Sequence, residues 1–191
     1  MVDIDSDLRL VNAVGGGSIN RELKLEQVAS DLSTKVVEYE PETSPILKIQ
    51  FEGLASTVML FTTGSYFIAG GSSINELYDT IDRLTKVLEK IGIVLSKDNI
   101  SFEIRNLVFQ WALENEFDLS ALSVGLGLED TEYNPESFPG AIYRPPTISA
   151  TFIIFRTGTI MLMGVSNKDD VVRYYTELEK KLTKLGIELK Y

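Results

Sequence analysis

The stretch Phe155-Arg156-Thr157-Gly158 repeats Phe61-Thr62-Thr63-Gly64 at an offset of 94 residues (155 − 61 = 94). Moving outward from these two stretches, the same offset aligns further identical residues without a gap: Asn12 with Asn106, Val14 with Val108, Tyr39 with Tyr133, Pro41 with Pro135, Gly70 with Gly164, Leu84 with Leu178 and Gly92 with Gly186. Chance similarity does not hold one register over this length. The chain is therefore a duplication, and the repeat determines the architecture before any single motif does.

Both copies predict the same order of elements, β-α-β-β-β-β-α. A first strand (residues 8–14 and 104–108) precedes a helix, and in the first copy the apolar residues of this helix fall on one face: Leu25, Val28, Ala29 and Leu32. Short strands separated by turn residues follow, in the first copy at residues 36–39, 46–51, 56–61 and 66–69. Gly64 and Gly158 are expected in hairpin turns.

A longer helix ends each copy. In the first copy, Ser73-x-x-Glu76 is a capping-box pattern and Gly92 is a C-terminal cap, as is Gly186 in the second. The predicted buried stripe of the first long helix is Ile74, Leu77, Tyr78, Ile81, Leu84 and Leu88. Two such units most economically share one antiparallel sheet, with all four helices on one face. The prediction is an α+β fold with one repeat in residues 1–95 and the other in residues 96–191.

The function of the protein depends on what binds to the face of the sheet that the helices leave uncovered. In residues 149–155 one alternating set is Thr151, Ile153 and Phe155, and the other is Ala150, Phe152 and Ile154. Both sets are largely apolar, whereas the helices can cover only one of them. The second apolar face is expected to meet a partner, either a ligand or a second copy of the chain in a homodimer.

Composition excludes several classes of function. The chain has no cysteine, so disulfides, thiolate zinc sites and cysteine nucleophiles are excluded, and no histidine, the usual general base at neutral pH. No cofactor is expected. The N-terminus lacks a secretory signal and no apolar run could cross a membrane, which predicts a cytoplasmic protein without membrane partners. A net charge of −10 argues against broad electrostatic attraction to nucleic acid or anionic lipid.

Residues 132–144, Glu-Tyr-Asn-Pro-Glu-Ser-Phe-Pro-Gly-Ala-Ile-Tyr-Arg, together with residues 153–158, closely resemble the second repeat of TATA-box-binding proteins. The first copy carries weaker forms of both motifs in residues 38–42 and 60–64, and the resemblance extends over residues 8–191. The short N-terminus and the acidic composition resemble the archaeal proteins of this family. The resemblance implies a saddle-shaped ten-stranded antiparallel sheet with four helices on its convex face.

The resemblance also implies a function. It implies a general transcription initiation factor, nucleoid-associated in an archaeon, that binds the minor groove of A·T-rich promoter DNA, bends it, and recruits transcription factor B and RNA polymerase. Apolar wedges between base steps would kink the duplex. By position, the wedges are Phe61, Phe138 and Phe155, and the expected DNA contacts also include Asn12, Val14, Asn106, Val108 and Arg144. Glu136 matches a contact with transcription factor B.

Several positions depart from the family pattern. Ser44 stands where the first copy would have its second wedge, and Gln50 stands where the second copy has Arg144. On the groove floor, bulky side chains replace smaller ones: Phe67, Met161 and Met163. Few basic contacts imply binding that depends weakly on salt.

Two alternatives remain open from the sequence. One is a divergent paralogue that acts mainly as a protein-interaction regulator of transcription with weak or altered DNA binding. The other is a nucleic-acid enzyme or its accessory domain, but the adjacent acids Glu129-Asp130 and Asp169-Asp170 are interpreted as a loop and a helix start. The prediction is therefore a protein that is not an enzyme.

Overall fold

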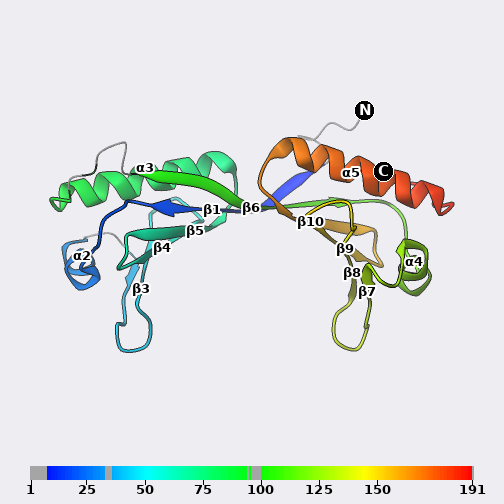
Figure 1. The fold of residues 1–191 in the computed structure, drawn as a ribbon, viewed down its shortest axis with the longest axis horizontal. Helices are drawn as coiled ribbons and strands as arrows, with labels where there is room; N and C mark the ends of the chain where they lie inside the picture. Colours follow the sequence, from blue (N-terminus) through cyan, green and yellow to red (C-terminus); the bar gives the residue numbers. More distant parts are fainter. Residues whose placement is uncertain (1–7, 33–35, 94, 96–99, 191) are drawn as a thin grey trace. The chain divides into compact units, whose positions relative to one another are not determined.

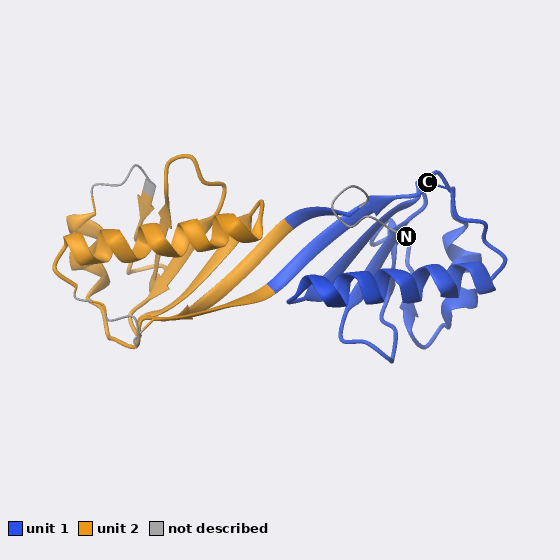
Figure 2. Ribbon diagram, turned by 90° about the horizontal axis from the view of Figure 1, so that it is seen from above, with its two compact units in different colours: residues 1–11, 106–191 blue, residues 12–105 orange. Residues whose placement is uncertain are grey.

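The computed structural model describes residues 8–32, 36–93, 95 and 100–190 (Figure 1). By its internal contacts the chain divides into two compact units, coloured separately in Figure 2. Unit 2 consists of residues 12–105, and unit 1 consists of residues 106–191 together with residues 1–11. Each unit thus contains one copy of the repeated pattern, apart from the ends of the two long strands β1 and β6.

The described strands and helices follow the predicted order in both copies. The first copy contains β1 (Arg9–Ser18), α2 (Leu25–Asp31), β2 (Val36–Glu38), β3 (Ile46–Gln50), β4 (Thr57–Phe61), β5 (Ser65–Gly71) and α3 (Ile74–Lys90). The second contains β6 (Ser101–Ala112), α4 (Leu119–Leu126), β7 (Thr131–Glu132), β8 (Gly140–Tyr143), β9 (Thr151–Phe155), β10 (Thr159–Val165) and α5 (Lys168–Lys184). The strands form one ten-stranded sheet in the order β2-β3-β4-β5-β1-β6-β10-β9-β8-β7. This confirms the predicted α+β fold, in which the two repeats together form one ten-stranded antiparallel sheet.

Period-two alternation places one side-chain set of each strand in the core. In β4, Val58 and Leu60 are fully buried, and in β9, Phe152 and Ile154 are buried. The long helices cover these sets with their own buried residues, such as Leu77 and Leu84 of α3 and Tyr175 and Leu178 of α5. In unit 1, Trp111 lies edge-on to Tyr175 at 5.0 Å between ring centroids. The core of each unit therefore lies between its strands and its long helix.

The buried stripe of α3 differs from the prediction at Tyr78. This side chain is 52% exposed and lies edge-on against Phe102, with 5.3 Å between the ring centroids. Thr80 is fully buried in its place, and its hydroxyl is 2.7 Å from that of Ser56. A polar pair that satisfies its own hydrogen bonds is tolerated in a core, which is why apolarity alone misassigned the stripe.

The helix ends agree with the capping signals. The Ser73 hydroxyl at the start of α3 accepts a hydrogen bond from the Glu76 N–H at 3.0 Å. At the start of α5, the Asn167 side-chain oxygen accepts one from the Asp170 N–H at 2.9 Å. The Glu76 carboxylate, however, accepts from Ser72, Ala55 and Ser56 rather than completing the capping box at Ser73. Gly92 and Gly186 end the long helices with φ of 84° and 80°, a conformation that favours glycine.

Strand β1 is longer than predicted because it continues through Gly15, Gly16 and Gly17. A β-carbon on Gly17 would lie 1.8 Å from the carbonyl oxygen of Ser101, and one on Gly15 would lie 2.4 Å from the Phe102 ring. These glycines allow the beginning of β6 to approach β1 closely. A run of glycines that resembles a turn in sequence is here part of a strand.

Candidate nucleic-acid interface

Each unit leaves one face of its strands without a helix, and this face is largely apolar. In unit 1 it carries the half-buried side chains of β9 and β10, which alternate with the core residues: Thr151, Ile153, Phe155, Met161 and Met163. In unit 2 the corresponding set on β4 and β5 is Thr57, Met59, Phe61, Phe67 and Ala69. The members of each set are neighbours on adjacent strands, because Met161 is paired with Ile153 and Met59 with Phe67. The alternation expected from the sequence is confirmed in both units.

A pair of phenylalanine rings lies on the helix-free face of each unit. In unit 1, the predicted residues Phe138 and Phe155 are brought together, with ring centroids 6.0 Å apart. Phe138 precedes β8 and is 36% exposed, so its ring is accessible. In unit 2, the partner of Phe61 is Phe67 of β5, at 6.1 Å and nearly perpendicular.

Each of the two predicted asparagines lies next to a register shift in the strand pairing. Asn12 lies on β1 beside the shift between Ala13 and Gly15. Asn106 lies on β6 next to Leu107, the partner of Val165 at one end of the shift in β10. Such bulges bend a strand and redirect side chains. The Asn106 Oδ1 accepts a hydrogen bond from the Gly164 N–H at 2.8 Å. Its side-chain oxygen is thereby engaged, and the amide nitrogen is the group that can donate to a ligand.

The two predicted valines differ in accessibility. Val14 of β1 is half-buried, whereas Val108 of β6 is 6% exposed. The identical residues at equivalent positions therefore do not present the same surface. Val108 is buried, whereas its role as a DNA contact stays a prediction.

Arg144, the predicted phosphate contact, is held in an ion pair. Its guanidinium donates to the Glu132 carboxylate at 2.9 Å. Unit 2 has a similar ion pair, in which the Lys48 Nζ lies 3.5 Å from the Glu38 Oε2. Glu38 and Glu132 are equivalent by the repeat (132 − 38 = 94), so in each unit an acid on the outermost strand neutralises a cation at the helix-free face. Sequence reasoning missed these acids, although their shared position in the repeat was a visible signal.

Glu136, the predicted partner contact, lies in an exposed turn before β8. Its backbone N–H donates to the Asn134 side chain at 3.1 Å, and Phe138 N–H donates to the Asn134 carbonyl at 2.9 Å. These bonds order the turn, with Glu136 exposed and Phe138 at its end. The same turn therefore carries one predicted DNA contact and one predicted protein contact.

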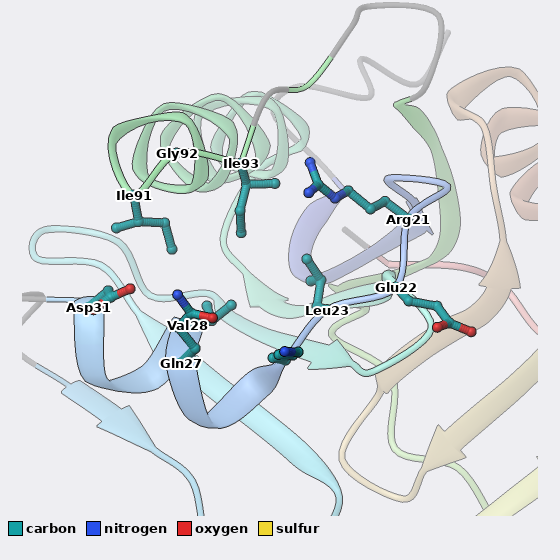
Figure 3. Close-up of a pocket in the computed structure, with 10 residues that line it drawn as sticks. Arg21, Glu22, Leu23, Gln27, Val28, Asp31, Ile91, Gly92 and Ile93 are labelled. Carbon is teal, nitrogen blue, oxygen red and sulfur yellow. The ribbon is translucent and has the colours of Figure 1, made fainter.

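A separate pocket in unit 2 lies between α2 and the end of α3 (Figure 3). Leu23, Val28, Ile91 and Ile93 form its apolar lining, and charged residues that include Arg21 and Asp31 surround them. None of the predicted site residues lines this pocket. In the described part of the chain, no group of His, Cys, Asp and Glu side chains could hold a metal ion.

Comparison with known proteins identifies the family. The sequence profile of "Transcription factor TFIID (or TATA-binding protein, TBP)" matches residues 7–91 and again residues 101–185. The two matches are separated by the offset of the internal repeat (101 − 7 = 94). The chain belongs to the TATA-binding protein family.

Relatives of the TATA-binding protein family match nearly the whole chain. TATA-box-binding protein C of Halobacterium salinarum is 32% identical over 93% of this chain and 98% of its own length. TATA-box-binding protein of Picrophilus torridus is 28% identical over 94% of this chain and 96% of its own length. The solved structure of Methanococcus jannaschii TBP superposes with a TM-score of 0.82 at 28% identity, covering 93% of this chain and 99% of that one.

These relatives and the solved structure are archaeal members of the TATA-binding protein family. Among the described residues, no helix combines the length and the apolar character needed to cross a lipid bilayer.

Proposed function

We propose that this member of the TATA-binding protein family is a general transcription initiation factor that binds the minor groove of A·T-rich promoter DNA and bends it. The observation that carries the proposal is the pair of phenylalanine rings on the helix-free apolar face of each unit. The minor groove offers few distinguishing hydrogen-bond groups, so apolar contact and shape carry much of its recognition. Aromatic rings inserted between base steps unstack them and kink the duplex.

The asparagines supply a polar preference for A·T pairs. The Asn106 oxygen is engaged by the Gly164 N–H, so its amide nitrogen is the group left to donate to a ligand. The minor-groove edges of A·T pairs carry only acceptors, whereas a G·C pair adds the guanine amino donor. A donor on the protein is therefore satisfied by A·T pairs and opposed by the guanine amino group. Asn12 is proposed to act in the same way in unit 2.

The remaining contacts follow from position. Val14 and Val108 are proposed to shape the apolar floor, and Arg144 to reach a phosphate. Transcription factor B is proposed to bind the exposed turn at Glu136, and this complex recruits RNA polymerase. In this role the protein binds without catalysis or cofactor, and it acts at the nucleoid of an archaeal cell.

The test is binding and bending of a TATA duplex by the double variant Phe138→Ala/Phe155→Ala. Loss of aromatic contact to a base costs about 1–3 kcal/mol, so two losses should weaken binding by about a hundredfold or more. Bending, measured by energy transfer between dyes at the duplex ends, should fall in parallel. Tyr78→Ala is the matched control, because this exposed aromatic belongs to α3 rather than to the helix-free face. Absence of binding by the unmodified protein from low to molar salt would refute the proposal.

One observation favours a second candidate, a divergent paralogue that regulates transcription mainly through protein contacts. Cations at both helix-free faces are neutralised by Glu38 and Glu132, which weakens attraction to phosphate. In that case the chain would capture transcription factor B without binding any duplex.

The apolar faces are also proposed to form a homodimer of the free protein. Because DNA would bind the same faces, it would dissociate this homodimer.

A further inference from the structure

The two aromatic pairs are built from different positions. Phe61 and Phe155 are equivalent by the repeat, but their ring partners are not, since Phe67 is equivalent to Met161 and Phe138 to Ser44 (161 − 67 = 94; 138 − 44 = 94). Both pairs nevertheless have almost the same separation, 6.1 Å in unit 2 and 6.0 Å in unit 1. Unit 2 therefore also has an aromatic pair, but its second ring comes from strand β5, whereas that of unit 1 comes from the turn before β8.

The turn before β3 does not explain this difference. The Ser44 N–H donates to the Glu40 carbonyl at 2.8 Å, and the Phe138 N–H donates to the equivalent Asn134 carbonyl at 2.9 Å. The backbone of the two turns is thus hydrogen-bonded in the same way. Unit 2 lacks a ring at this place because the residue is serine.

The positions of glycines near the rings also differ between the two units. A β-carbon on Gly140 would lie 3.0 Å from the Phe138 ring and 3.2 Å from the Phe155 ring, so this glycine makes room for the pair in unit 1. Its equivalent in unit 2 is Ile46 (140 − 46 = 94), which pairs directly with Phe61.

The reverse holds for the other ring of unit 2. A β-carbon on Gly16 would lie 3.0 Å from the Phe67 ring, whereas the equivalent residue of unit 1 is Gln110 (110 − 16 = 94). Each unit thus has a glycine beneath the ring that it carries and a larger side chain where that ring is missing.

Phe67 is placed to meet a ligand. It is 42% exposed, although its neighbours Tyr66 and Ile68 are buried on the helix side of β5. It is opposite Met59 on one side and Gly16 on the other, in the middle of the helix-free face of unit 2. A large apolar ring exposed to this extent on an apolar face is typical of a contact surface.

We infer that Phe67 is the second aromatic wedge of unit 2 and replaces the ring that Ser44 cannot supply. The inference rests on the proposed binding of A·T-rich DNA. Ser44 precedes β3, whereas Phe67 belongs to β5, two strands further toward the middle of the strand order. At about 4.8 Å between neighbouring strands, the ring is displaced inward by about 10 Å. Unit 2 therefore carries its second ring two strands nearer to β1 than a ring at position 44 would lie.

The experiment maps unstacked base steps with 2-aminopurine, placed at one adenine position at a time in a TATA duplex. Fluorescence should rise at one set of positions that depends on Phe138 and at a second, separate set that depends on Phe67. Phe67→Ala should abolish the second set and weaken binding about tenfold. Phe67→Leu should keep part of both, because leucine can also act as a wedge. Ser44→Ala is the control and should change neither quantity.

The outcomes separate this inference from the proposed function. If Phe67→Ala leaves the fluorescence pattern and the affinity unchanged while Phe138→Ala alters them, the inference is wrong and the proposed function stands. If the unmodified protein binds no duplex, both are wrong. Thermal unfolding of Phe67→Ala verifies that the exposed substitution leaves the fold intact.

Discussion

At the scale of single residues, ion pairing limits what the basic side chains can contribute to DNA binding. Arg144 would neutralise a phosphate only after leaving Glu132, which lies 2.9 Å away. An exposed ion pair of this kind contributes at most about 1 kcal/mol, so it does not prevent the exchange. The acid nevertheless repels the phosphates that the arginine attracts.

Replacing this acid should strengthen DNA binding. Glu132→Gln removes the competing charge, so affinity for a TATA duplex should rise and the plot of log K against log salt should steepen by about one. The measurement is fluorescence anisotropy over a salt series. Glu136→Gln is the matched control, since it removes the same charge from the exposed turn. An equal effect of both substitutions would show that net charge, rather than release of Arg144, is responsible.

At the scale of elements, Glu76 connects helix α3 to the loop between β3 and β4. Its carboxylate accepts hydrogen bonds from the Ala55 N–H at 2.7 Å, the Ser56 N–H at 2.8 Å and the Ser72 N–H at 2.9 Å. Burial alone would raise the pKa of this carboxyl, but the bonds from Ser72, Ser56 and Ala55 outweigh burial and lower the pKa to about 2. The equivalent residue in α5, Asp170, bonds to Asn167 and Arg173 instead.

The stability of the protein should therefore depend on Glu76 and on pH. The folded-state pKa lies below the unfolded value, so the carboxylate stabilises the fold above about pH 4.5 and loses this effect as the pH falls toward 2. Glu76→Gln should lower the free energy of unfolding by about 2 kcal/mol at pH 7, because the amide cannot accept all of these bonds. Chemical denaturation at several pH values measures the difference, which should shrink below pH 4.5. Asp170→Asn should have a smaller effect, and a difference for Glu76→Gln that does not vary with pH would contradict this account.

At the scale of the whole molecule, the net charge of −10 and the ion-paired cations predict weak dependence of DNA binding on salt. With about two phosphates neutralised, the slope of log K against log salt is about −1.8, so a fourfold rise in salt weakens binding only about tenfold. Titrations at four salt concentrations measure this slope. A loss of a thousandfold or more would mean that many phosphate contacts exist, and that apolar contact does not provide most of the binding free energy.

The sequence alone determined the duplication, the α+β order of elements, the turn and cap glycines and the apolar helix-free face. These features depend on periodicity and on local backbone preference, and both copies of the repeat contain the same signals for them. Only the tertiary structure decided that Phe67 pairs with Phe61, that Val108 is buried, that Glu132 holds Arg144 and that the glycines of β1 continue a strand. Each of these is set by a neighbour on another strand. Strand register and close approach bring such neighbours together, and a repeat read along the chain does not contain that information.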